Sequence, residues 1–235
     1  DVSGRTAANT AVDFAFTGGS ANDSIKLATD VLGKLTSGAQ LDGGAGTDKL
    51  GISDTVLTTA EFAALNAAKN FETLGLNAAI TLDASKLTSL KSFSLDADNA
   101  VTINNMATGS AVATSTDITS AVVLAGATGV KDLSLTLTGT TSNPGVALTT
   151  LTVGQTDIAL VSAGPGTAAN VITTLNNADN STITVTGSND LTIRNPLKGT
   201  ATGSKVDASA LTGNLDVTGS ALSDILIGGS GNDTL

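Results

Sequence analysis

Two consecutive nonapeptides close the sequence and constrain its fold more than any other feature. Residues 219 to 227 read G-S-A-L-S-D-I-L-I and residues 228 to 235 read G-G-S-G-N-D-T-L, with Asp sixth and Leu eighth in both. The pattern G-G-x-G-x-D-x-U-x, where U is a large aliphatic residue, is typical of a parallel β-roll that binds calcium in its turns. Calcium takes roughly six to eight oxygen ligands, which Asp carboxylates and the unobstructed carbonyl groups of glycine-rich turns can supply.

Two further copies of this Gly-Asp turn lie near the beginning of the chain. Residues 18 to 26 read G-G-S-A-N-D-S-I-K and residues 43 to 51 read G-G-A-G-T-D-K-L-G, again with Asp sixth and an aliphatic residue eighth. One such copy is compatible with an ordinary turn, but four copies in one chain favour a repeat. Because these two copies follow each other after 25 residues and not after a nonapeptide, we expect them to flank an inserted rung and not to be adjacent turns of an uninterrupted roll.

The acidic composition fits calcium turns and argues against several other functions. The formal net charge is −10, and all 21 acidic residues are Asp except Glu61 and Glu72. Asp is the short acid that suits turns and calcium loops. The 11 Lys and Arg residues are scattered singly, so neither an anion site nor binding to nucleic acid or an anionic membrane is expected. The longest apolar runs are short and interrupted by polar residues, so no transmembrane helix and no membrane insertion are expected.

Residue types that catalysis commonly requires are scarce. The chain has no His and no Cys, and its only aromatic residues are five Phe. Zinc hydrolysis and Ser-His chemistry need imidazole, and sugar clefts commonly stack rings on aromatic faces, so we do not expect an enzyme. Without Cys no disulfide is available, and stability has to come from packing, backbone hydrogen bonds or metal.

Short alternating segments predict an all-β fold. The run V-D-F-A-F-T from Val12 places Val12, Phe14 and Phe16 on one face of a strand. Segments beginning at residues 71, 90 and 130 share a pattern of apolar and polar positions in alternation. Such strands are too short to build a sandwich core individually, but stacked rungs bury a continuous core. Further candidate strands are 101–103, 121–124, 148–153, 158–161, 183–185, 191–193 and 215–217.

One helix is expected among these strands. The run T-T-A-E from Thr58 to Glu61 is a capping box, and apolar residues follow it at helical spacing, which predicts a helix over 58–69.

The expected architecture is one parallel β-solenoid or β-roll with calcium-binding turns and one short helix. In this organisation residues 1–57 carry a strand and two Gly-Asp turns, and residues 58–70 the helix. Irregular rungs follow in 71–218, and a further nonapeptide array starts in 219–235. Because that array stops one residue short of a full nonapeptide and neither an initiator Met nor a signal peptide is present, we expect the chain to be part of a longer protein.

A second internal repeat reads D-A-S-K-L-T at 83–88 and D-A-S-A-L-T at 207–212. Asp and Ser side chains accept hydrogen bonds from backbone N–H groups one or two residues further on, so we expect a corner between strands at both places. A catalytic Asp-Ser pair is the alternative, but no base accompanies it.

Taken in order, these motifs resemble the calcium-binding RTX proteins of type I secretion. Within them, they resemble bacterial surface-layer (S-layer) proteins whose C-terminal part is a calcium-loaded β-solenoid. The amino-acid composition is similar to that of such S-layer proteins along nearly the whole chain, with few aromatic residues, no Cys and abundant Thr, Ala, Gly and Asn. Only the Gly-Asp turns are specific enough to carry residue roles. The segments that carry the resemblance are F-T-G-G-S-A-N-D-S-I at 16–25, L-D-G-G-A-G-T-D-K-L at 41–50, N-F-E-T-L at 70–74, V-D-A-S-A-L-T-G at 206–213 and the closing nonapeptides.

The resemblance implies a set of calcium ligands. The turns of Asp23 and Asp48 would share an ion across the inserted rung. In the closing pair Ser220 and Leu222 depart from the glycine pattern, and the pair needs a further turn to complete its site, so its metal would be partial. The implied carboxylate ligands are Asp23, Asp48, Asp224 and Asp233, and the implied carbonyl ligands are those of Gly18, Ser20, Gly43, Ala45, Gly219, Gly228 and Ser230.

By the same resemblance, the chain is expected to be a secreted structural protein of the extracellular cell surface. Its folding and its self-association into a lattice would depend on Ca2+, and another region of the protein would contact cell-surface polysaccharide. One alternative is a calcium-stabilised module of an RTX adhesin, which stays monomeric and binds a surface ligand. The other is a β-helix enzyme acting on acidic polysaccharide, which needs a base beside neutralising cations. No two Lys or Arg residues lie at matching positions on adjacent predicted strands.

Overall fold

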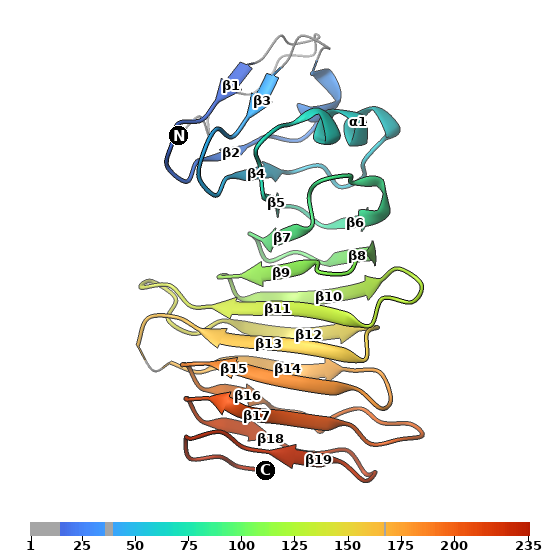
Figure 1. The fold of residues 1–235 in the computed structure, drawn as a ribbon, viewed down its shortest axis with the longest axis vertical. Coiled ribbons are helices and arrows are strands. Elements are labelled where there is room, and N and C mark those ends of the chain that lie inside the picture. Colours follow the sequence, from blue (N-terminus) through green and yellow to red (C-terminus); the bar gives the residue numbers. More distant parts are fainter. Residues whose placement is uncertain (1–14, 36–39, 167) are drawn as a thin grey trace.

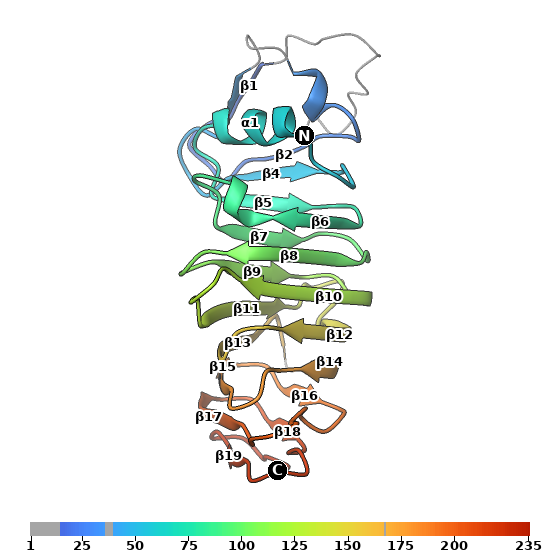
Figure 2. The same cartoon turned by 90° about the vertical axis from the view of Figure 1, so that its right-hand side faces the viewer.

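The computed structural model describes residues 15–35, 40–166 and 168–235. Over these residues the chain is an all-β parallel solenoid of about nine coils with a single short α-helix. Successive coils are stacked along the long axis, from the N-terminal end at the top to the C-terminal end at the bottom of Figure 1, and Figure 2 shows the same stack turned by 90°. The fold class predicted from the alternating segments is confirmed.

The described strands form two long sheets and one short one, and every strand pair is parallel. The short sheet pairs β1 (Ala15–Thr17) with β3 (Gln40–Asp42). The ten-stranded sheet contains β2 (Ser24–Lys26), β4 (Lys49–Ile52), β5 (Thr73–Leu76), β7 (Ser92–Leu95), β9 (Ala111–Thr114), β11 (Asp132–Thr138), β13 (Asp157–Ala163), β15 (Thr182–Gly187), β17 (Lys205–Leu211) and β19 (Ile225–Ile227). The seven-stranded sheet contains β6 (Ile80–Asp83), β8 (Val101–Met106), β10 (Ile118–Gly126), β12 (Ala147–Val153), β14 (Asn170–Asn176), β16 (Leu191–Ile193) and β18 (Leu215–Val217).

The strand register gives the length of a coil, which varies along the chain. Ser92 pairs with Ala111, 19 positions later, whereas Val122 pairs with Leu151, 29 positions later. The connections between the strands absorb most of the difference, and three strand pairs also contain a register shift: β10 with β12, β10 with β8, and β15 with β17. The variable coil length explains why the sequence has no fixed repeat period.

The core consists of columns of apolar side chains that run along the solenoid axis. Parallel pairing brings the same strand position of each coil above its counterpart, and strand alternation turns every second residue inward. In the ten-stranded sheet the register connects eight residues in one column, none more than 1% exposed: Ile25, Leu50, Leu74, Phe93, Val112, Leu135, Leu160 and Val185. In the seven-stranded sheet Val101, Val122, Leu151 and Leu175 form a matching column.

The helix predicted over 58–69 is present as α1 (Thr59–Ala67), and its capping box is confirmed. Thr58 Oγ1 accepts a hydrogen bond from the Glu61 N–H at 3.3 Å, and Glu61 Oε2 accepts one from the Thr58 N–H at 2.6 Å. Phe62 and Leu65 are buried. The helix packs against η1 (Leu32–Lys34), so these two elements lie together near the N-terminal coils.

The predicted strands are present with small shifts of their ends, and some strands were not predicted. Residues 71–76 contain β5, residues 90–95 contain β7, and residues 130–137 overlap β11. The strands without a counterpart in the prediction are β2, β3, β4, β6, β9, β14, β17 and β19. Of the first predicted strand, Val12 and Phe14 lie outside the described residues. Its Phe16 is half-buried, and its ring stacks on Phe71 with centroids 6.2 Å apart.

The two D-A-S segments do not form the same structure. At the first, Asp83 Oδ1 accepts a hydrogen bond from the Ser85 N–H, and the chain turns through η2 (Ala84–Lys86), as expected. At the second, Asp207 Oδ1 accepts the same bond from Ser209, yet the segment stays within β17, so the predicted corner at 207–212 is wrong. The strand absorbs the irregularity as a register shift against β15, because its neighbours hold it in the sheet.

Candidate calcium-binding turns

The turns of Asp23 and Asp48 lie directly on one another in adjacent coils. The strands before and after them are paired, β1 with β3 and β2 with β4. Two backbone hydrogen bonds join the turns themselves, from Ala45 N to Gly19 O at 2.8 Å and from Lys49 N to Asp23 O at 2.9 Å. The prediction of an inserted rung between them is therefore wrong, because 25 residues form one complete coil here.

Glycine is needed in these turns because the coils approach each other closely. A Cβ atom on Gly18 would lie 1.8 Å from the carbonyl oxygen of Gly43, a distance no side chain can accept. Gly46 has φ of +134°, a left-handed conformation that strongly favours glycine. The glycines of the motif thus allow two turns to stack at backbone contact distance.

The acidic side chains of the turns bind backbone N–H groups. Asp23 Oδ2 accepts a hydrogen bond from the Gly19 N–H in its own turn at 2.7 Å. Asp48 Oδ1 accepts one from the Asp23 N–H of the preceding coil at 2.6 Å, and Glu72 Oε2 accepts one from the Asp48 N–H at 2.7 Å. A row of three acids therefore crosses three consecutive coils, each fixed by the backbone of a turn.

One carboxylate oxygen in this row has no partner. Asp48 is 1% exposed, and its Oδ2 atom is buried without a hydrogen-bond partner. An unpaired buried oxygen of an acid is costly and calls for an explanation, of which a bound ion is one. Within the described residues, none of the four carbonyl groups predicted as ligands in these turns, those of Gly18, Ser20, Gly43 and Ala45, accepts a hydrogen bond. These oxygens fit the ligand chemistry of calcium.

The acids do not form a compact carboxylate cage. In the part of the chain that the structure describes, no three acidic, His or Cys side chains gather as a metal cluster. A cation at these turns would therefore depend largely on backbone carbonyl groups, with carboxylate oxygens from Asp48 and Asp23.

The closing pair of turns is arranged differently. The turn of Asp224 leads into β19 of the ten-stranded sheet, whereas the turn of Asp233 leads to Thr234, which bridges to Asp216 beside the seven-stranded sheet. The two turns therefore lie on different sides of the solenoid and share no site. The carbonyl groups of Gly219, Gly228 and Ser230 accept no hydrogen bond from any described residue.

Asp224 is already fully bound within the protein. Its Oδ1 accepts a hydrogen bond from the Ser204 N–H at 2.6 Å, and its Oδ2 accepts bonds from the N–H and hydroxyl of Ser220 at 2.6 and 2.8 Å. Burial raises the pKa of this carboxyl, but the hydrogen bonds outweigh burial and leave the pKa below its usual value. Asp233 Oδ1 accepts a bond from the Leu215 N–H at 2.8 Å.

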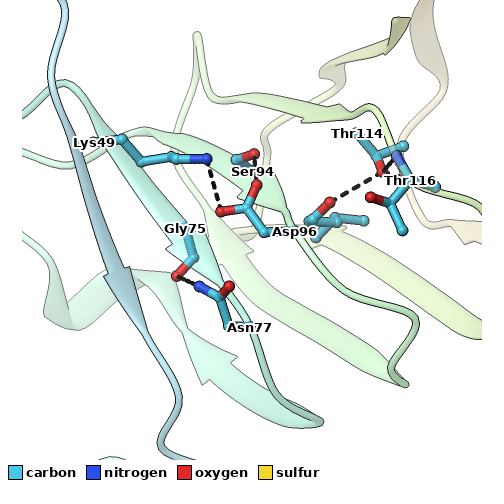
Figure 3. A network of polar contacts seen from close by, with 8 residues as sticks. Lys49, Gly75, Asn77, Ser94, Asp96, Thr114 and Thr116 are labelled. Carbon is cyan, nitrogen blue, oxygen red and sulfur yellow. Dashed lines mark hydrogen bonds and ion pairs between the residues drawn. The ribbon is translucent and has the colours of Figure 1, made fainter. Parts of the chain in front are cut away.

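A polar cluster on the outer face of the ten-stranded sheet was not predicted from the sequence (Figure 3). The Lys49 side chain extends to Asp96, with 2.9 Å between Nζ and Oδ2, and the Ser94 hydroxyl donates to the same carboxylate. Lys26 and Lys49 line one pocket from the adjacent strands β2 and β4. The expectation that Lys and Arg residues are scattered singly therefore does not hold at this place. The signal would have been the 25-residue coil, which pairs Lys49 with Ser24 and so places it two strand positions from Lys26 on the same face.

Comparison with known proteins gives no relative of this chain. No family model matches it, and no curated protein or solved structure matches it either. None of the helices in the described ranges has the length and hydropathy needed to span a membrane. What the fold establishes is the class, a parallel β-solenoid, which is consistent with a structural or repeat protein.

Proposed function

We propose that this chain is a structural module of a secreted bacterial surface layer, in which Ca2+ bound between stacked Gly-Asp turns drives folding and self-assembly. The observation that carries the proposal is the Oδ2 atom of Asp48, a buried carboxylate oxygen that has no hydrogen-bond partner. The carbonyl groups of the same two turns that accept no hydrogen bond from a described residue support the proposal, and so does the parallel solenoid. The resemblance of the motifs to RTX S-layer proteins supports the finer assignment.

The residues that would hold the ion come from two consecutive coils. Asp48 would provide its unpaired carboxylate oxygen, and the turns of residues 18–23 and 43–48 would provide carbonyl oxygens. When bound, calcium supplies positive charge that compensates the buried carboxylate and joins the two coils.

Calcium binding at such a site is coupled to folding. The two turns are separated by 25 residues in the sequence and meet only when the coils stack. An unfolded chain therefore lacks the site, and the free energy of binding adds to the free energy of folding. Extracellular calcium sites work at roughly 10⁻⁴ to 10⁻³ M, so the chain would stay loosely folded inside the cell and fold after secretion.

The experiment is a calcium titration of chelator-treated protein, followed by far-UV circular dichroism and by size-exclusion chromatography with light scattering. The test variant is Asp48→Asn, which keeps the size of the side chain and an oxygen to accept the Asp23 N–H. The matched control is Asp157→Asn at an exposed strand position in the middle of the solenoid. We expect calcium to increase the β signal and to produce multimers in the parent chain and the control, and the response of Asp48→Asn to need at least about tenfold more calcium.

Each alternative gives a different result in this titration. Compaction of a monomer without multimers would support a calcium-stabilised adhesin module instead of a lattice protein. An unchanged β signal and unchanged size, or an equal response of Asp48→Asn and the control, would refute calcium binding at these turns.

A further inference from the structure

The outer face of the ten-stranded sheet contains an open polar pocket of about 260 Å³ near its N-terminal end. It extends from β2 across β4 to the segments that follow β5, β7 and β9. Its charged lining residues are Lys26, Lys49 and Asp96, and the others are Ser24, Gly51, Asn77, Ser115 and Thr116. Its lining includes the strands β2 and β4, which directly follow the two Gly-Asp turns, but none of the candidate calcium ligands of those turns.

The lysines make this pocket locally cationic on an acidic protein. Lys26 pairs with Gly51, and Ser24 pairs with Lys49, so both lysines stand on the outer face of adjacent strands. Lys49 is bound to Asp96, whereas Lys26 is exposed. Two lysines against one aspartate leave an excess positive charge here, although the whole chain carries −10. The pocket therefore favours a ligand with a negative charge.

Two buried glycines lie beneath the charged side chains of the pocket. Gly51 and Gly75 are neighbours on β4 and β5. A Cβ atom on Gly75 would lie 2.5 Å from Asp96 Oδ2 and 3.3 Å from Lys49 Cδ, and one on Gly51 would lie 3.1 Å from Asn77 Nδ2. The absence of a side chain at Gly75 lets Lys49 cross β5 to reach Asp96, as Figure 3 shows. These two charged side chains cover Gly75, so a ligand in the pocket meets them and not the backbone beneath.

The rim offers hydrogen-bond donors and acceptors at close spacing. Asp96 accepts from Ser94, and it keeps further acceptor capacity because a carboxylate has about four lone-pair sites. The Asn77 amide donates to the Gly75 carbonyl at 3.4 Å, a long bond that a better acceptor could replace. Hydroxyl groups of Ser115 and Thr116 complete the far side. Mixed donors and acceptors of this kind match the hydroxyl groups of a sugar.

We propose that this pocket binds a carboxylated sugar residue, such as a hexuronate unit of an acidic polysaccharide. The sugar carboxylate pairs with Lys26 and Lys49, and ring hydroxyl groups bind Asp96 and Asn77. The volume is below the roughly 300–1,000 Å³ of sites for drug-sized ligands, so the pocket takes about one sugar unit at a time. The proposal does not depend on calcium binding at the turns.

The test is isothermal titration calorimetry of the 235-residue chain with trigalacturonate. The main variant is Lys26→Met, which keeps the aliphatic stem and removes the exposed charge outside the Lys49–Asp96 pair. Its matched control is Lys198→Met, another exposed lysine, in the loop after β16 and distant from the pocket along the solenoid. We expect Lys26→Met to weaken binding about tenfold or more, as loss of a charged hydrogen bond does, and Lys198→Met to bind like the parent chain. Absence of binding, or equal binding by both variants, would overturn the proposal.

Two further arms define the ligand class. Maltotriose, which is neutral, should bind at least about tenfold more weakly than trigalacturonate; equal affinity would overturn the role of the carboxylate. Inorganic phosphate should not compete at equal concentration; efficient competition would mean a general anion site and would overturn the sugar assignment. Gly75→Ala should weaken binding while far-UV circular dichroism keeps the β signal of the parent, because the new methyl group displaces the side chains of Asp96 and Lys49. Unchanged affinity of a folded Gly75→Ala protein would refute the role of the Lys49–Asp96 pair in the pocket.

Discussion

Asp48 Oδ1 accepts a 2.6 Å hydrogen bond from the backbone N–H of Asp23, one coil earlier in the solenoid. The turn acid is therefore a link between coils whether or not calcium is bound. The same relationship recurs along the molecule, where a carboxylate of one coil caps a backbone N–H of a neighbouring coil. Further examples are Asp54 with Asp30, Glu72 with Asp48, Asp98 with Thr119, Asp117 with Ala147, Asp132 with Gly109, Asp179 with Thr200, Asp190 with Asn214, Asp224 with Ser204 and Asp233 with Leu215.

Removing such a link should destabilise the solenoid. Asp224→Ala leaves the N–H groups of Ser204 and Ser220 without their acceptor, so we expect the free energy of unfolding to fall by about 1–3 kcal/mol. Urea unfolding followed by circular dichroism measures this. Asp157→Ala, at an exposed position, serves as control and should change stability by less than about 0.5 kcal/mol. Equal stability of the two variants would mean that the carboxylate links contribute nothing.

Asp54 should make the protein less stable as the pH rises. Burial raises the pKa of its carboxyl, and the nearby charge of Glu61 adds to this, against a hydrogen bond from the Asp30 N–H. Because the folded state holds the proton more tightly than the unfolded state, its contribution favours folding at low pH and is lost as pH rises through the raised pKa. We expect Asp54→Asn to be more stable than the parent at pH ~7, with the difference vanishing near pH ~4.

Each unit by which the pKa of Asp54 is raised corresponds to about 1.4 kcal/mol of this gain. Urea unfolding at the two pH values measures it, and Asp157→Asn is the control for loss of an exposed acid. A variant that is less stable than the parent at neutral pH would show that the buried charge is compensated.

The alternation of apolar residues predicted the strands, because it reports directly on which side chains face the core, and the Gly-Asp nonapeptides indicated that these strands stack as a parallel solenoid. The helix at 58–69 was predictable for a similar reason, since Thr58 and Glu61 form a local capping box. By contrast, β9 and β14 were missed. Their sequences, A-V-A-T and N-V-I-T-T-L-N, give weak local signals, and the pairing with neighbouring strands decides their conformation.

The site was predicted in its residues but not in its arrangement. The Gly-Asp pattern identified Asp23 and Asp48 correctly as turn residues, yet a nonapeptide step was taken as the measure of adjacency, whereas one coil takes 25 residues at this point. Because the coil length was unknown, the pocket of Lys26 and Lys49 was not predicted either. Coil length depends on how each connection packs, so side chains from different coils cannot be aligned from a sequence whose coils vary from 18 to 30 residues.

The carboxyl of Asp207 should titrate in strong acid. Hydrogen bonds from Lys205 and Ser209 lower its pKa to about 2, and the Lys205 ammonium lies 2.9 Å from Oδ2. The ionised form favours the folded state, so this contribution is complete above the ordinary pKa and is lost as pH falls through about 2. Carbon-detected NMR titration measures the midpoint, and Lys205→Met should move it upward. A midpoint for Asp207 that is unchanged in Lys205→Met would contradict the role of the lysine.

A cavity in the apolar column should destabilise mainly the coils next to it. Leu135 is fully buried in β11, between Val112 and Leu160 of the adjacent strands. Leu135→Ala should lower the free energy of unfolding by about 2–5 kcal/mol. Since each coil of a solenoid contacts only its neighbours, hydrogen exchange should accelerate most in β9, β11 and β13 and much less in β4. Uniform acceleration along the whole chain would instead indicate that the solenoid unfolds as one cooperative unit.

Two adjacent glycines provide the sharpest test of how the Gly-Asp turns stack. A methyl group on Gly18 would lie 1.8 Å from the Gly43 carbonyl oxygen and 2.7 Å from Asp23 Oδ2, whereas the nearest atom to one on Gly19 is 3.9 Å away. Gly18→Ala must therefore push two coils apart, and we expect it to destabilise the N-terminal coils by about 1–3 kcal/mol. Gly19→Ala makes the same chemical change at the neighbouring residue, and its free energy of unfolding should remain close to that of the parent chain.

Hydrogen exchange over residues 15–52 distinguishes the two variants, because only separation of the turns exposes the Ala45 and Lys49 N–H groups that bond to the preceding coil. Equal protection in both variants would mean that the turns do not meet at this distance, and a calcium site shared between them would lose its structural basis.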